Sequence, residues 1–315
     1  MKPISQTLTR LRRWLNIRGS RKPWAMIVIN PAAGQVNPDL KTLNRILREA
    51  GYRYEVEFTA NMGDGKRLAE KAVVLGARFV AACGGDGTIM DVAAGLAHSQ
   101  VPLAILPNGT GNALAKELAI PMNFSAACRL LTGEGSLVRE IDIASVGEQP
   151  FLLRLGVGLE AQITRTADRD YKDRMGVLAY ITATLQSIGQ APVSRYTIEM
   201  DGQVEEVEGL ACMIANAGTL GVPGLSISPL VKIDDGLLDV FVLRRADLSE
   251  ISSLAASAMG VPPGPASIPH WQCRQLTLTA EPAQDVEVDG EEHGQTPIQV
   301  SVLPKALRVI VPQSV

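Results

Sequence analysis

The residues best suited to chemistry form a glycine turn, Gly84-Gly85-Asp86-Gly87-Thr88, which directly follows the apolar run Phe79–Cys83. An apolar run of this length, bounded by turn residues, predicts a buried strand. Apolar residues at helical spacing follow the turn: Ile89, Val92, Ala93 and Leu96. Thr88 is expected to cap this helix, with Asp91 completing a capping box. A strand, a glycine turn and a helix start present free backbone N–H groups to an anion, typically a phosphate.

Asp86 places a carboxylate inside this anion site. A carboxylate beside a polyphosphate is repelled unless a divalent metal ion lies between them or the carboxylate takes part in proton transfer. The alternative is an ordinary strand-to-helix turn whose aspartate hydrogen-bonds only its own loop. The turn lacks both the Lys-Ser/Thr ending of a P-loop and the third glycine of a dinucleotide-binding fingerprint.

The composition predicts a cytoplasmic protein of two domains. A length of 315 residues is long for one domain, and 46% hydrophobic residues suffice for real cores. A formal net charge of −3 gives no support for nucleic-acid binding. The four cysteines are scattered without a CxxC pair, which argues against a zinc site or a disulfide framework. No apolar run is long enough to span a membrane.

Residues 1–23 form a basic arm in front of the first predicted strand. Within residues 1–22 there are seven basic side chains and no acidic one. Leu8, Leu11, Trp14 and Leu15 can share one face of a helix, so the arm could lie on the inner surface of an anionic membrane. A disordered basic tail is the alternative.

Residues 24–139 alternate between strand and helix patterns. Strands are expected at residues 25–29, 54–58, 79–83 and 102–106, with helices from Leu40 to near Gly51 and from Gly65 to Leu75. This alternation predicts an α/β domain with a parallel sheet and with ligand loops at the carboxyl ends of the strands.

The remainder of the chain, residues 140–304, predicts an all-β sandwich-like or barrel-like domain. Its strand-like runs lie at residues 151–157, 196–200, 210–215, 238–243, 275–279, 286–288 and 298–302. Two helical stretches are expected near residues 178–188 and 249–259, and a proline-rich loop at 261–269. A last strand is expected at Ala306–Val311, and the pattern leaves open which sheet receives it.

A second glycine loop, Pro107-Asn108-Gly109-Thr110-Gly111-Asn112, also follows a strand and opens a helix, so two loops could wrap one polyphosphate. Together with Gly84–Thr88, this loop resembles the diacylglycerol kinase catalytic-domain family, which includes bacterial lipid kinases, sphingosine kinases and ceramide kinases. The resemblance continues through five further segments: Asn30–Gly34, Gly158–Ala161, Arg174–Tyr180, Pro229–Val240 and Val288–Glu291.

The resemblance implies a nucleotide-binding domain followed by a β-sandwich, with the C-terminal strand, residues 305–315, returning to the first domain. It implies ATP and Mg²⁺ as cofactors and a general base at Asp289 or Glu291, while Asp86 would act through magnesium or accept the proton itself. The implied nucleotide contacts are Asn30, Pro31, Ala32, Ala33, Gly34, Thr59, Gly85, Asp86, Gly87, Thr88, Ile89, Met90, Asp91 and Thr110.

The family pattern also implies a structural magnesium ion, held by the side chain of Asp235 and the backbone carbonyls of Lys232 and Leu237. Taken alone, both Asp235-Gly236 and Asp289-Gly290 could simply be turns. One departure concerns Ala113, which stands where many diacylglycerol-kinase-like members have an aspartate. Any acidic network that uses that aspartate is therefore absent or rebuilt here.

The sequence thus predicts an ATP- and Mg²⁺-dependent lipid kinase that phosphorylates a hydroxyl of a diacylglycerol-like or sphingoid-base-like lipid. An NAD kinase-like enzyme shares the Gly-Gly-Asp-Gly loop and is one alternative. A catalytically silent nucleotide-binding regulatory protein is the other, favoured only by Ala113. The expected partner is a lipid at a membrane surface, not a nucleic acid, and a homodimer is left open.

Overall fold

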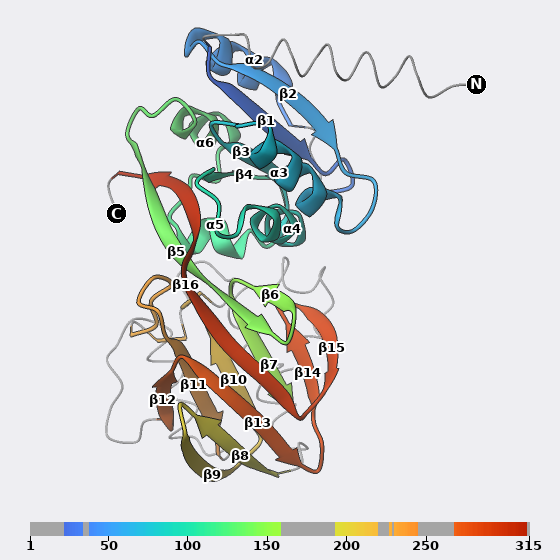
Figure 1. The fold of residues 1–315 in the computed structure, drawn as a ribbon, viewed down its shortest axis with the longest axis vertical. Coiled ribbons are helices and arrows are strands. Elements are labelled where there is room, and N and C mark those ends of the chain that lie inside the picture. Colours follow the sequence, from blue (N-terminus) through green and yellow to red (C-terminus); the bar gives the residue numbers. More distant parts are fainter. Residues whose placement is uncertain are drawn as a thin grey trace, which may run out of the picture. The chain divides into compact units, whose positions relative to one another are not determined.

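The computed structural model describes residues 22–33, 38–158, 193–219, 227–228, 230–244 and 268–313. Several predictions from the sequence lie outside these residues: the basic arm up to residue 21, Gly34, the helices near 178–188 and 249–259, and most of the loop at 261–269. The chain divides into two compact units, one of residues 1–140 with 306–315 and one of residues 141–305. Figure 1 shows the elements of both units.

The first unit is built on a parallel sheet, as predicted. Its strands are β1 (Trp24–Ile29), β2 (Arg53–Phe58), β3 (Val80–Gly84) and β4 (Leu103–Pro107). They lie in the order β2-β1-β3-β4, followed by the end of β16 (Ile298–Pro312). Every residue of β1, β3 and β4 is buried, which explains their continuous apolar sequences.

Helices connect these strands and bury one face each. They are α2 (Leu40–Glu49), α3 (Asp64–Val74), α4 (Asp86–Leu96), α5 (Ala113–Glu117) and α6 (Phe124–Leu130). Asp39 caps α2, because its side chain accepts hydrogen bonds from the amides of Lys41 and Thr42. Helices α3 and α4 pack closely: a Cβ on Gly95 would clash with the carbonyl oxygen of Lys66. Helix α6 was not predicted.

The capping box predicted for α4 is wrong. The helix begins at Asp86, with Gly85 as its N-cap residue in an extended conformation, and within the described ranges no side chain caps it. Thr88 lies inside the first turn, where its hydroxyl accepts a hydrogen bond from Asn30. Asp91 accepts one from the amide of Gly63 instead. Tertiary partners therefore take both side chains that could have capped the helix locally.

The second unit consists of strands in its described part, and the predicted β-sandwich-like fold is confirmed. One sheet has the order β12-β11-β10-β7-β14-β15 and is antiparallel throughout. Its strands are β7 (Arg154–Gly158), β10 (Ala211–Ala215), β11 (Leu238–Leu243), β12 (His270–Cys273), β14 (Asp285–Val288) and β15 (Glu291–Gln295).

The other strands of this unit pair around the first part of β16. They are β5 (Ser136–Val146), β6 (Gln149–Phe151), β8 (Ser194–Met200), β9 (Gln203–Gly209) and β13 (Gln275–Glu281). Strand β16 pairs with β13, β13 with β8, and β8 with β9, all antiparallel, while β5 pairs with β16 and β6.

Two strand predictions differ from the structure in their boundaries. The run predicted as one strand at 151–157 is the end of β6 and most of β7, because the chain leaves the ladder at Leu152 and Leu153. The runs at 298–302 and 306–311 are one strand, β16. Its end returns to the first unit, where Val309 pairs in parallel with Leu103. None of the helices in the described ranges has the length and apolar character needed to cross a bilayer.

Candidate active site

The loops of interest in the first unit meet at the point where the strand order reverses. From β1 the chain moves to β2 on one side, and then to β3 and β4 on the other side. In open α/β sheets, ligands bind outside the carboxyl ends of the strands at such a switch point. Here the amide of Asn30, just after β1, donates to the carbonyl of Cys83 in β3 at 3.0 Å. The Asn30 side chain donates to the Thr88 hydroxyl, also at 3.0 Å.

The segment Asn30–Ala33, here called the Asn30 loop, is a tight turn with a fixed backbone. The side-chain oxygen of Asn30 accepts from the amide of Ala32 at 2.9 Å, and its carbonyl accepts from the amide of Ala33 at 3.2 Å. Asn108, which follows β4, donates its side-chain amide to the carbonyl of Ala33 at 3.2 Å. The loops after β1, β3 and β4 are thus joined by side-chain hydrogen bonds.

The Asp86 turn (Gly84–Thr88) and the Gly109 loop (Asn108–Asn112) approach each other at the level of their backbones. A Cβ on Gly109 would clash with Cα of Gly85, and a Cβ on Gly111 would lie 2.7 Å from Oδ2 of Asp86. At Gly109 a side chain would force the two backbones apart, whereas at Gly111 it would displace the Asp86 carboxylate. Because no side chain of the described residues caps α4, the N–H groups of its first turn remain for a ligand between these loops.

Asp86 connects the two glycine loops. Its Oδ1 accepts a long hydrogen bond, 3.4 Å, from the amide of Leu114 in α5. Burial raises the pKa of Asp86, while the amides of Leu114, Ala113 and Asn112 and the charge of Lys116 lower it. The alternative in which Asp86 bonds only its own loop is therefore wrong, since its carboxylate faces the amides of the second loop's helix.

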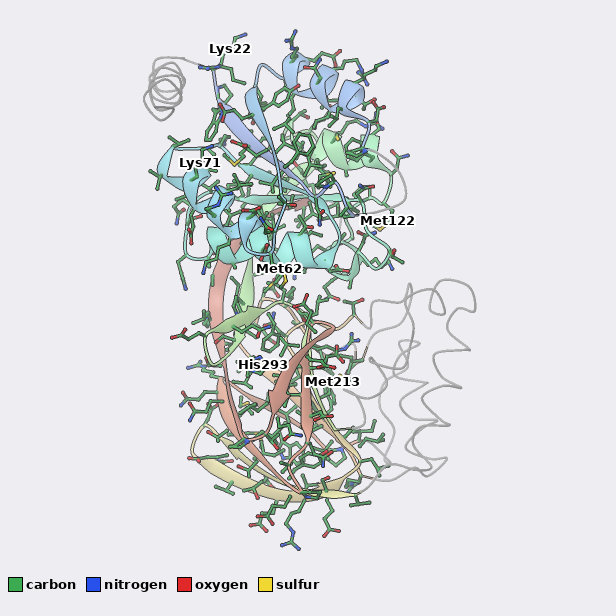
Figure 2. All side chains as sticks on the ribbon, turned by 90° about the vertical axis from the view of Figure 1, so that its right-hand side faces the viewer. Lys22, Met62, Lys71, Met122, Met213 and His293 are labelled. Atoms are coloured by element: carbon green, nitrogen blue, oxygen red, sulfur yellow. The ribbon has the colours of Figure 1, made fainter. Side chains whose placement is uncertain are left out.

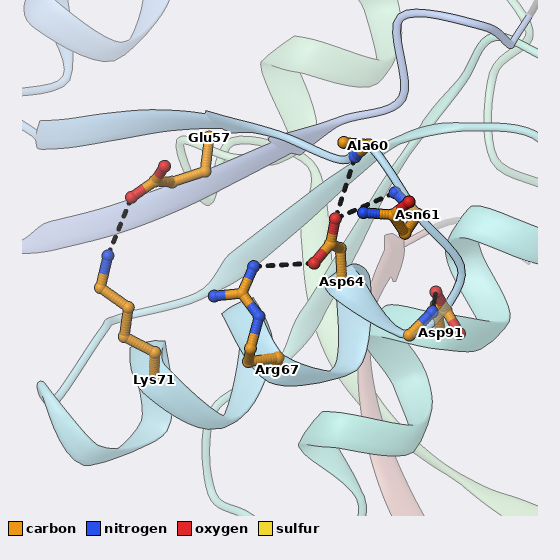
Figure 3. A network of polar contacts seen from close by, with 8 residues as sticks. Glu57, Ala60, Asn61, Asp64, Arg67, Lys71 and Asp91 are labelled. Atoms are coloured by element: carbon orange, nitrogen blue, oxygen red, sulfur yellow. Dashed lines mark hydrogen bonds and ion pairs between the residues drawn. The ribbon is translucent and has the colours of Figure 1, made fainter.

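Thr59 lies where β2 ends, beside the Asn30 loop. Its amide donates to the carbonyl of Ile29 at 2.9 Å. The loop that follows is held by Asp64, which accepts from the amides of Ala60 and Asn61, both at 3.0 Å, and from Arg67 at 2.8 Å (Figure 3). The hydrogen bond from Arg67 is the main cause that lowers the pKa of Asp64 to about 2.

The end of this loop, just before α3, is also held by a hydrogen bond to α4. Asp91 of α4 accepts from the amide of Gly63 at 2.8 Å. In the last turn of α3, away from this loop, Lys71 forms an ion pair with Glu57 of β2 at 2.8 Å (Figure 3). The Met62 side chain of this loop is 87% exposed; it is labelled in Figure 2. Of the other predicted nucleotide contacts, Ile89 has its side chain fully buried in the core and Thr110 is exposed.

The Asp-Gly-Glu motif belongs to the second unit, in the hairpin between β14 and β15. Asp289 and Gly290 form its turn with φ values of 50° and 96°, which suits a two-residue hairpin. Asp289-Gly290 is therefore a turn, as one interpretation of the sequence predicted, but the Asp289 side chain also accepts three hydrogen bonds. Its Oδ2 accepts from the amide of Leu152 at 2.9 Å, and its Oδ1 accepts from Leu153 and Arg154 at 3.1 and 2.9 Å.

Asp289 and Glu291, the two candidates for the general base, differ in their surroundings. Burial raises the pKa of Asp289 to about 6, although the three amides and the charge of Arg154 lower it. Glu291 is exposed at the start of β15. A carboxylate with a pKa near neutral pH is better suited to accept a proton during a reaction than a fully solvated one.

The predicted structural magnesium site is a turn before β11. Asp235 accepts from the amide of Leu237 through its Oδ1 at 3.0 Å. Burial raises the pKa of Asp235, and the negative charges of Asp239, Asp142 and Asp234 add to this effect. Within the described ranges, no group of three or more His, Cys, Asp or Glu side chains is placed to hold a metal ion.

Sequence reasoning missed the polar residues that hold these turns. Asp142, fully buried in β5, accepts from the amides of Gly236 and Lys305 at 2.7 and 2.6 Å. Asn216, also buried, donates to the carbonyl of Leu152 at 2.8 Å. The signal for Asp142 was its position between Ile141 and Ile143, since an aspartate inside an apolar strand must have partners. Asn216 carried no comparable signal.

A parallel sheet whose switch point holds two interlocked glycine loops and an aspartate, followed by a β-sandwich, is an arrangement suited to phosphate transfer. Residues 24–146 match the family described as diacylglycerol kinase catalytic domain, and residues 154–311 match the one described as YegS C-terminal NAD kinase beta sandwich-like domain.

Similar proteins cover nearly the whole chain. A protein of Pseudomonas aeruginosa named "Probable lipid kinase YegS-like" is 32% identical over 88% of this chain and 90% of its own. The protein of Bacillus subtilis named "Diacylglycerol kinase" is 27% identical over 92% of this chain and 96% of its own. A crystal structure of a diacylglycerol kinase from Bacillus anthracis superimposes with a TM-score of 0.76 at 27% identity, over 93% of this chain and 98% of that one.

The chain therefore belongs to the diacylglycerol kinase catalytic-domain family. The resemblance, the two-part fold and the predicted enzyme class, a lipid kinase that transfers phosphate to an alcohol, are confirmed.

Proposed function

We propose that this lipid kinase uses ATP and Mg²⁺ to phosphorylate a hydroxyl of a diacylglycerol-like or sphingoid-base-like lipid. The observation that carries the proposal is the interlocked pair of glycine loops at the switch point, with Asp86 bound to the amide of Leu114. Backbone amides at an uncapped helix start are suited to hold phosphate oxygens without any lysine. Two of the predicted nucleotide contacts, Asn30 and Thr88, are hydrogen-bonded to each other here, and a third, Ala33, accepts a hydrogen bond from Asn108.

The proposed reaction is a displacement at the terminal phosphorus of ATP. The lipid hydroxyl oxygen forms a bond to this phosphorus, the bond to the oxygen that bridges to the middle phosphate breaks, and ADP leaves. The hydroxyl proton passes to a carboxylate of the protein. Positioning and charge neutralisation, which the loops of the first unit supply, account for most of the catalysis in such a transfer.

Asp289 is the carboxylate that best fits the role of general base. Its pKa of about 6 leaves it mostly ionised at neutral pH and still basic enough to accept a proton. Three amides occupy most of its acceptor positions, two on Oδ1 and one on Oδ2, so Oδ2 keeps a lone pair for the substrate hydroxyl. Asp86 then takes the other proposed role, in which it acts on the phosphates through magnesium.

The residues present fit Mg²⁺, which would neutralise charge on the transferred phosphate when bound. The raised pKa of Asp86 reflects a half-buried carboxylate with only partial compensation, so a cation beside it would be stabilised. At the second site, Asp235 and the carbonyls of Lys232 and Leu237 would provide hard oxygen ligands. The surrounding negative charges of Asp142, Asp234 and Asp239 favour a cation there.

The test is transfer of labelled phosphate from ATP, with Mg²⁺, to lipids in mixed micelles. The panel contains diacylglycerol, monoacylglycerol, sphingosine and ceramide, with NAD as a soluble control. A labelled lipid that disappears with Asp86→Asn supports the proposal and identifies the acceptor. Labelled NADP in place of a lipid product would overturn it, and ATP binding without any product would favour a regulatory protein.

The basic arm is proposed to bring the enzyme to its substrate. Its seven positive charges within residues 1–22 favour binding to an anionic surface. Sedimentation with vesicles of phosphatidylglycerol, but not with vesicles of phosphatidylcholine alone, is expected for the full chain. Deletion of residues 1–22 should remove this binding and leave turnover of a dispersed short-chain lipid unchanged.

A further inference from the structure

The hydrogen bonds that hold Asp289 come from a short segment outside the regular sheet. Leu152 and Leu153 lie between the end of β6 and the start of β7, and Arg154 is the first residue of β7. Their three amides converge on the Asp289 carboxylate, while the amide of Asp289 donates back to the carbonyl of Arg154 at 3.0 Å. The orientation of these peptide groups therefore determines how the carboxylate is held.

Asn216, directly after β10, binds the other side of the same peptide groups. Its side-chain Nδ2 donates to the carbonyl of Leu152 at 2.8 Å, and its backbone amide donates to the carbonyl of Leu153 at 2.9 Å. The same Nδ2 also lies 3.4 Å from the carbonyl oxygen of Asp142. Because both neighbours of Nδ2 are acceptors, the amino group must point this way, which fixes the orientation of the side-chain amide.

The two sets of contacts are joined through rigid units. A peptide group is planar, and in the trans form its C=O and N–H point in opposite directions. The peptide between Leu152 and Leu153 accepts from Asn216 Nδ2 on one side and donates to Asp289 Oδ1 on the other. The next peptide, between Leu153 and Arg154, likewise joins the Asn216 backbone amide to Asp289 Oδ1. Neither plane can rotate without changing both contacts.

We infer that Asn216 is a positioning residue, which orients the Leu152–Leu153 peptide so that its N–H holds the Asp289 carboxylate ready to accept the substrate proton. The inference rests on the proposed function, in which Asp289 is the general base. Asn216 is only 1% exposed, and its Oδ1 is buried without a hydrogen-bond partner in the described part of the chain. An unpaired buried oxygen costs stability, so we attribute the role of the Asn216 side chain to its donor group, Nδ2.

Within the described residues, the charged groups around Asp289 lie on strands β5, β7, β14 and β15, and none of them is changed by a substitution at Asn216. Arg154 on β7 lowers the pKa of Asp289 through its charge. In the described part of the hairpin, the titratable side chains nearest to it in sequence are Glu287 on β14 and Glu291 on β15. Asp142 on β5 lies on the Asn216 side, where its carbonyl oxygen is 3.4 Å from Nδ2. On the β10 side, Asn216 itself is neutral. A change at Asn216 therefore acts on Asp289 through hydrogen bonds to the carboxylate, which favour its charged form and keep its pKa down.

Gln284 provides a matched control in the same unit. It is buried, and its side-chain amide also donates to two backbone carbonyls, those of Pro282 and Ala283 at 3.0 and 3.2 Å. It lies just before β14, at the opposite end of that strand from Asp289. Gln284→Ala therefore removes a comparable buried amide from the same unit without touching the peptides that hold Asp289.

The experiment compares the wild-type chain with Asn216→Ala and Gln284→Ala. The amide resonances of Leu152, Leu153 and Arg154 are followed by NMR from pH 4 to 8, with Asp289→Asn as the reference that removes the titration. Asn216→Ala should move the titration midpoint upward by about half to one pH unit because a hydrogen bond to the charged form is weakened. Gln284→Ala should leave it at the wild-type value. If Asn216→Ala does not fold, Asn216→Ser is used, with a smaller shift expected.

Lipid phosphorylation supplies the second measurement. Asn216→Ala should lower kcat about tenfold and move the acid limb of the pH profile upward by the same amount as the titration, with KM for ATP unchanged. An unshifted titration in a folded Asn216 variant overturns the inference, whatever the activity. If the wild type transfers no phosphate, the proposed function fails, and the NMR titration still decides whether Asn216 positions Asp289.

Discussion

At the scale of single residues, the proposed chemistry of the first unit gives Asp86 the central role. Replacement by Asn keeps an oxygen that can accept from the amide of Leu114 but removes the negative charge. We therefore expect Asp86→Asn to lower kcat by at least about 100-fold, since electrostatic contributions to phosphoryl transfer are of this order. The unfolding temperature should stay within a few degrees of wild type. Near-normal turnover in this variant would contradict the assigned role.

If Asp289 is the general base, as proposed, its ionisation determines the pH dependence of turnover. As a base it must be ionised, and its pKa of about 6 is raised from the ordinary value, so activity should be lost as pH falls through about 6. Below this value kcat/KM should fall about tenfold per pH unit, as for a single essential ionised group.

Asp289→Asn and Glu291→Gln each replace one carboxylate by a neutral amide, so their comparison identifies which residue is the general base. With Asp289→Asn, the activity should fall by about 100-fold or more and the limb near pH 6 should disappear. If Glu291→Gln has this effect and Asp289→Asn does not, the base is Glu291.

For single residues, the sequence indicated which side chains could belong to the site but not which groups they hydrogen-bond. The glycines and Asp86 could be singled out because a strand, a turn and a helix are local patterns. The donors to Asp289 could not, because Leu152 and Leu153 act through their amides, about which side-chain identity says nothing. The capping box at Thr88 failed for a related reason: the local motif was intact, but Asn30, 58 residues away, bound the same hydroxyl.

Among the elements, the contact between the two glycine loops is the most sensitive to substitution. Gly109→Ala places a Cβ against Cα of Gly85, so the loops must separate. We expect KM for ATP to rise at least about tenfold, because a small displacement of backbone donors strongly weakens phosphate binding. Binding of a fluorescent ATP analogue measures the same loss without the lipid.

Gly95→Ala is the matched comparison for that variant. Its new Cβ meets the Lys66 carbonyl between α3 and α4, away from the glycine loops. It should lower the free energy of unfolding by about 1–3 kcal/mol, as overpacked sites do, and leave nucleotide affinity unchanged. Equal nucleotide affinity in Gly95→Ala and Gly109→Ala would mean that the loop contact has no special role.

The turn after β2 offers a prediction on stability and pH. The pKa of Asp64 is lowered to about 2, so its hydrogen bonds to Ala60, Asn61 and Arg67 stabilise the fold above about pH 4. This contribution should disappear as pH falls from about 4 to about 2, and Asp64→Asn should remove most of it at neutral pH. Thermal unfolding at pH 7, 4 and 3 measures the difference between the two chains, which should narrow toward low pH. A constant difference would contradict the assignment.

The elements themselves were largely predictable, because their patterns are strong. Fully buried strands such as β1 and β3 are apolar at nearly every position, and α2 shows a regular apolar face. Strands β5, β9, β12 and β15 were missed. The residues of β9 and β15 are mostly exposed and polar, so no alternation marks them. Strand β12 has only four residues, and β5 runs across the domain boundary that was predicted at residue 139. The break at Leu152–Leu153 was missed because both residues are apolar and buried, like the strand residues on either side.

For the whole molecule, the decisive feature is that β16 contributes to both units. Its first part pairs with β13 in the second unit, and its last part supplies the strand beside β4 in the first. The sequence pattern could not show this, because a strand's pattern gives its burial but not its partner. Only the family resemblance implied the return of the C-terminal strand. Here Leu307 and Val309 are fully buried within the first unit.

Deletion of residues 306–315 should therefore inactivate the nucleotide site although every loop residue remains. The deletion removes buried Leu307 and Val309 and the hydrogen bond from the amide of His98 to the carbonyl of Ala306, 2.7 Å long. Loss of two large buried side chains costs several kcal/mol, about 2–5 for each, which is enough to unfold a unit of this size. A chain that ends at Gln313 retains every residue of β16 and is the control.

Two tryptophans report on the units separately, since Trp24 lies in β1 and Trp271 in β12. In chains that keep one tryptophan, the others being replaced by Phe, the deletion should shift Trp24 emission to the red without denaturant. Trp271 emission should stay unchanged, because the part of β16 that pairs with β13 is still present. Nucleotide binding should disappear together with the Trp24 shift. Retained ATP binding in the deleted chain would show that β1 to β4 form a stable site on their own, without the returning strand.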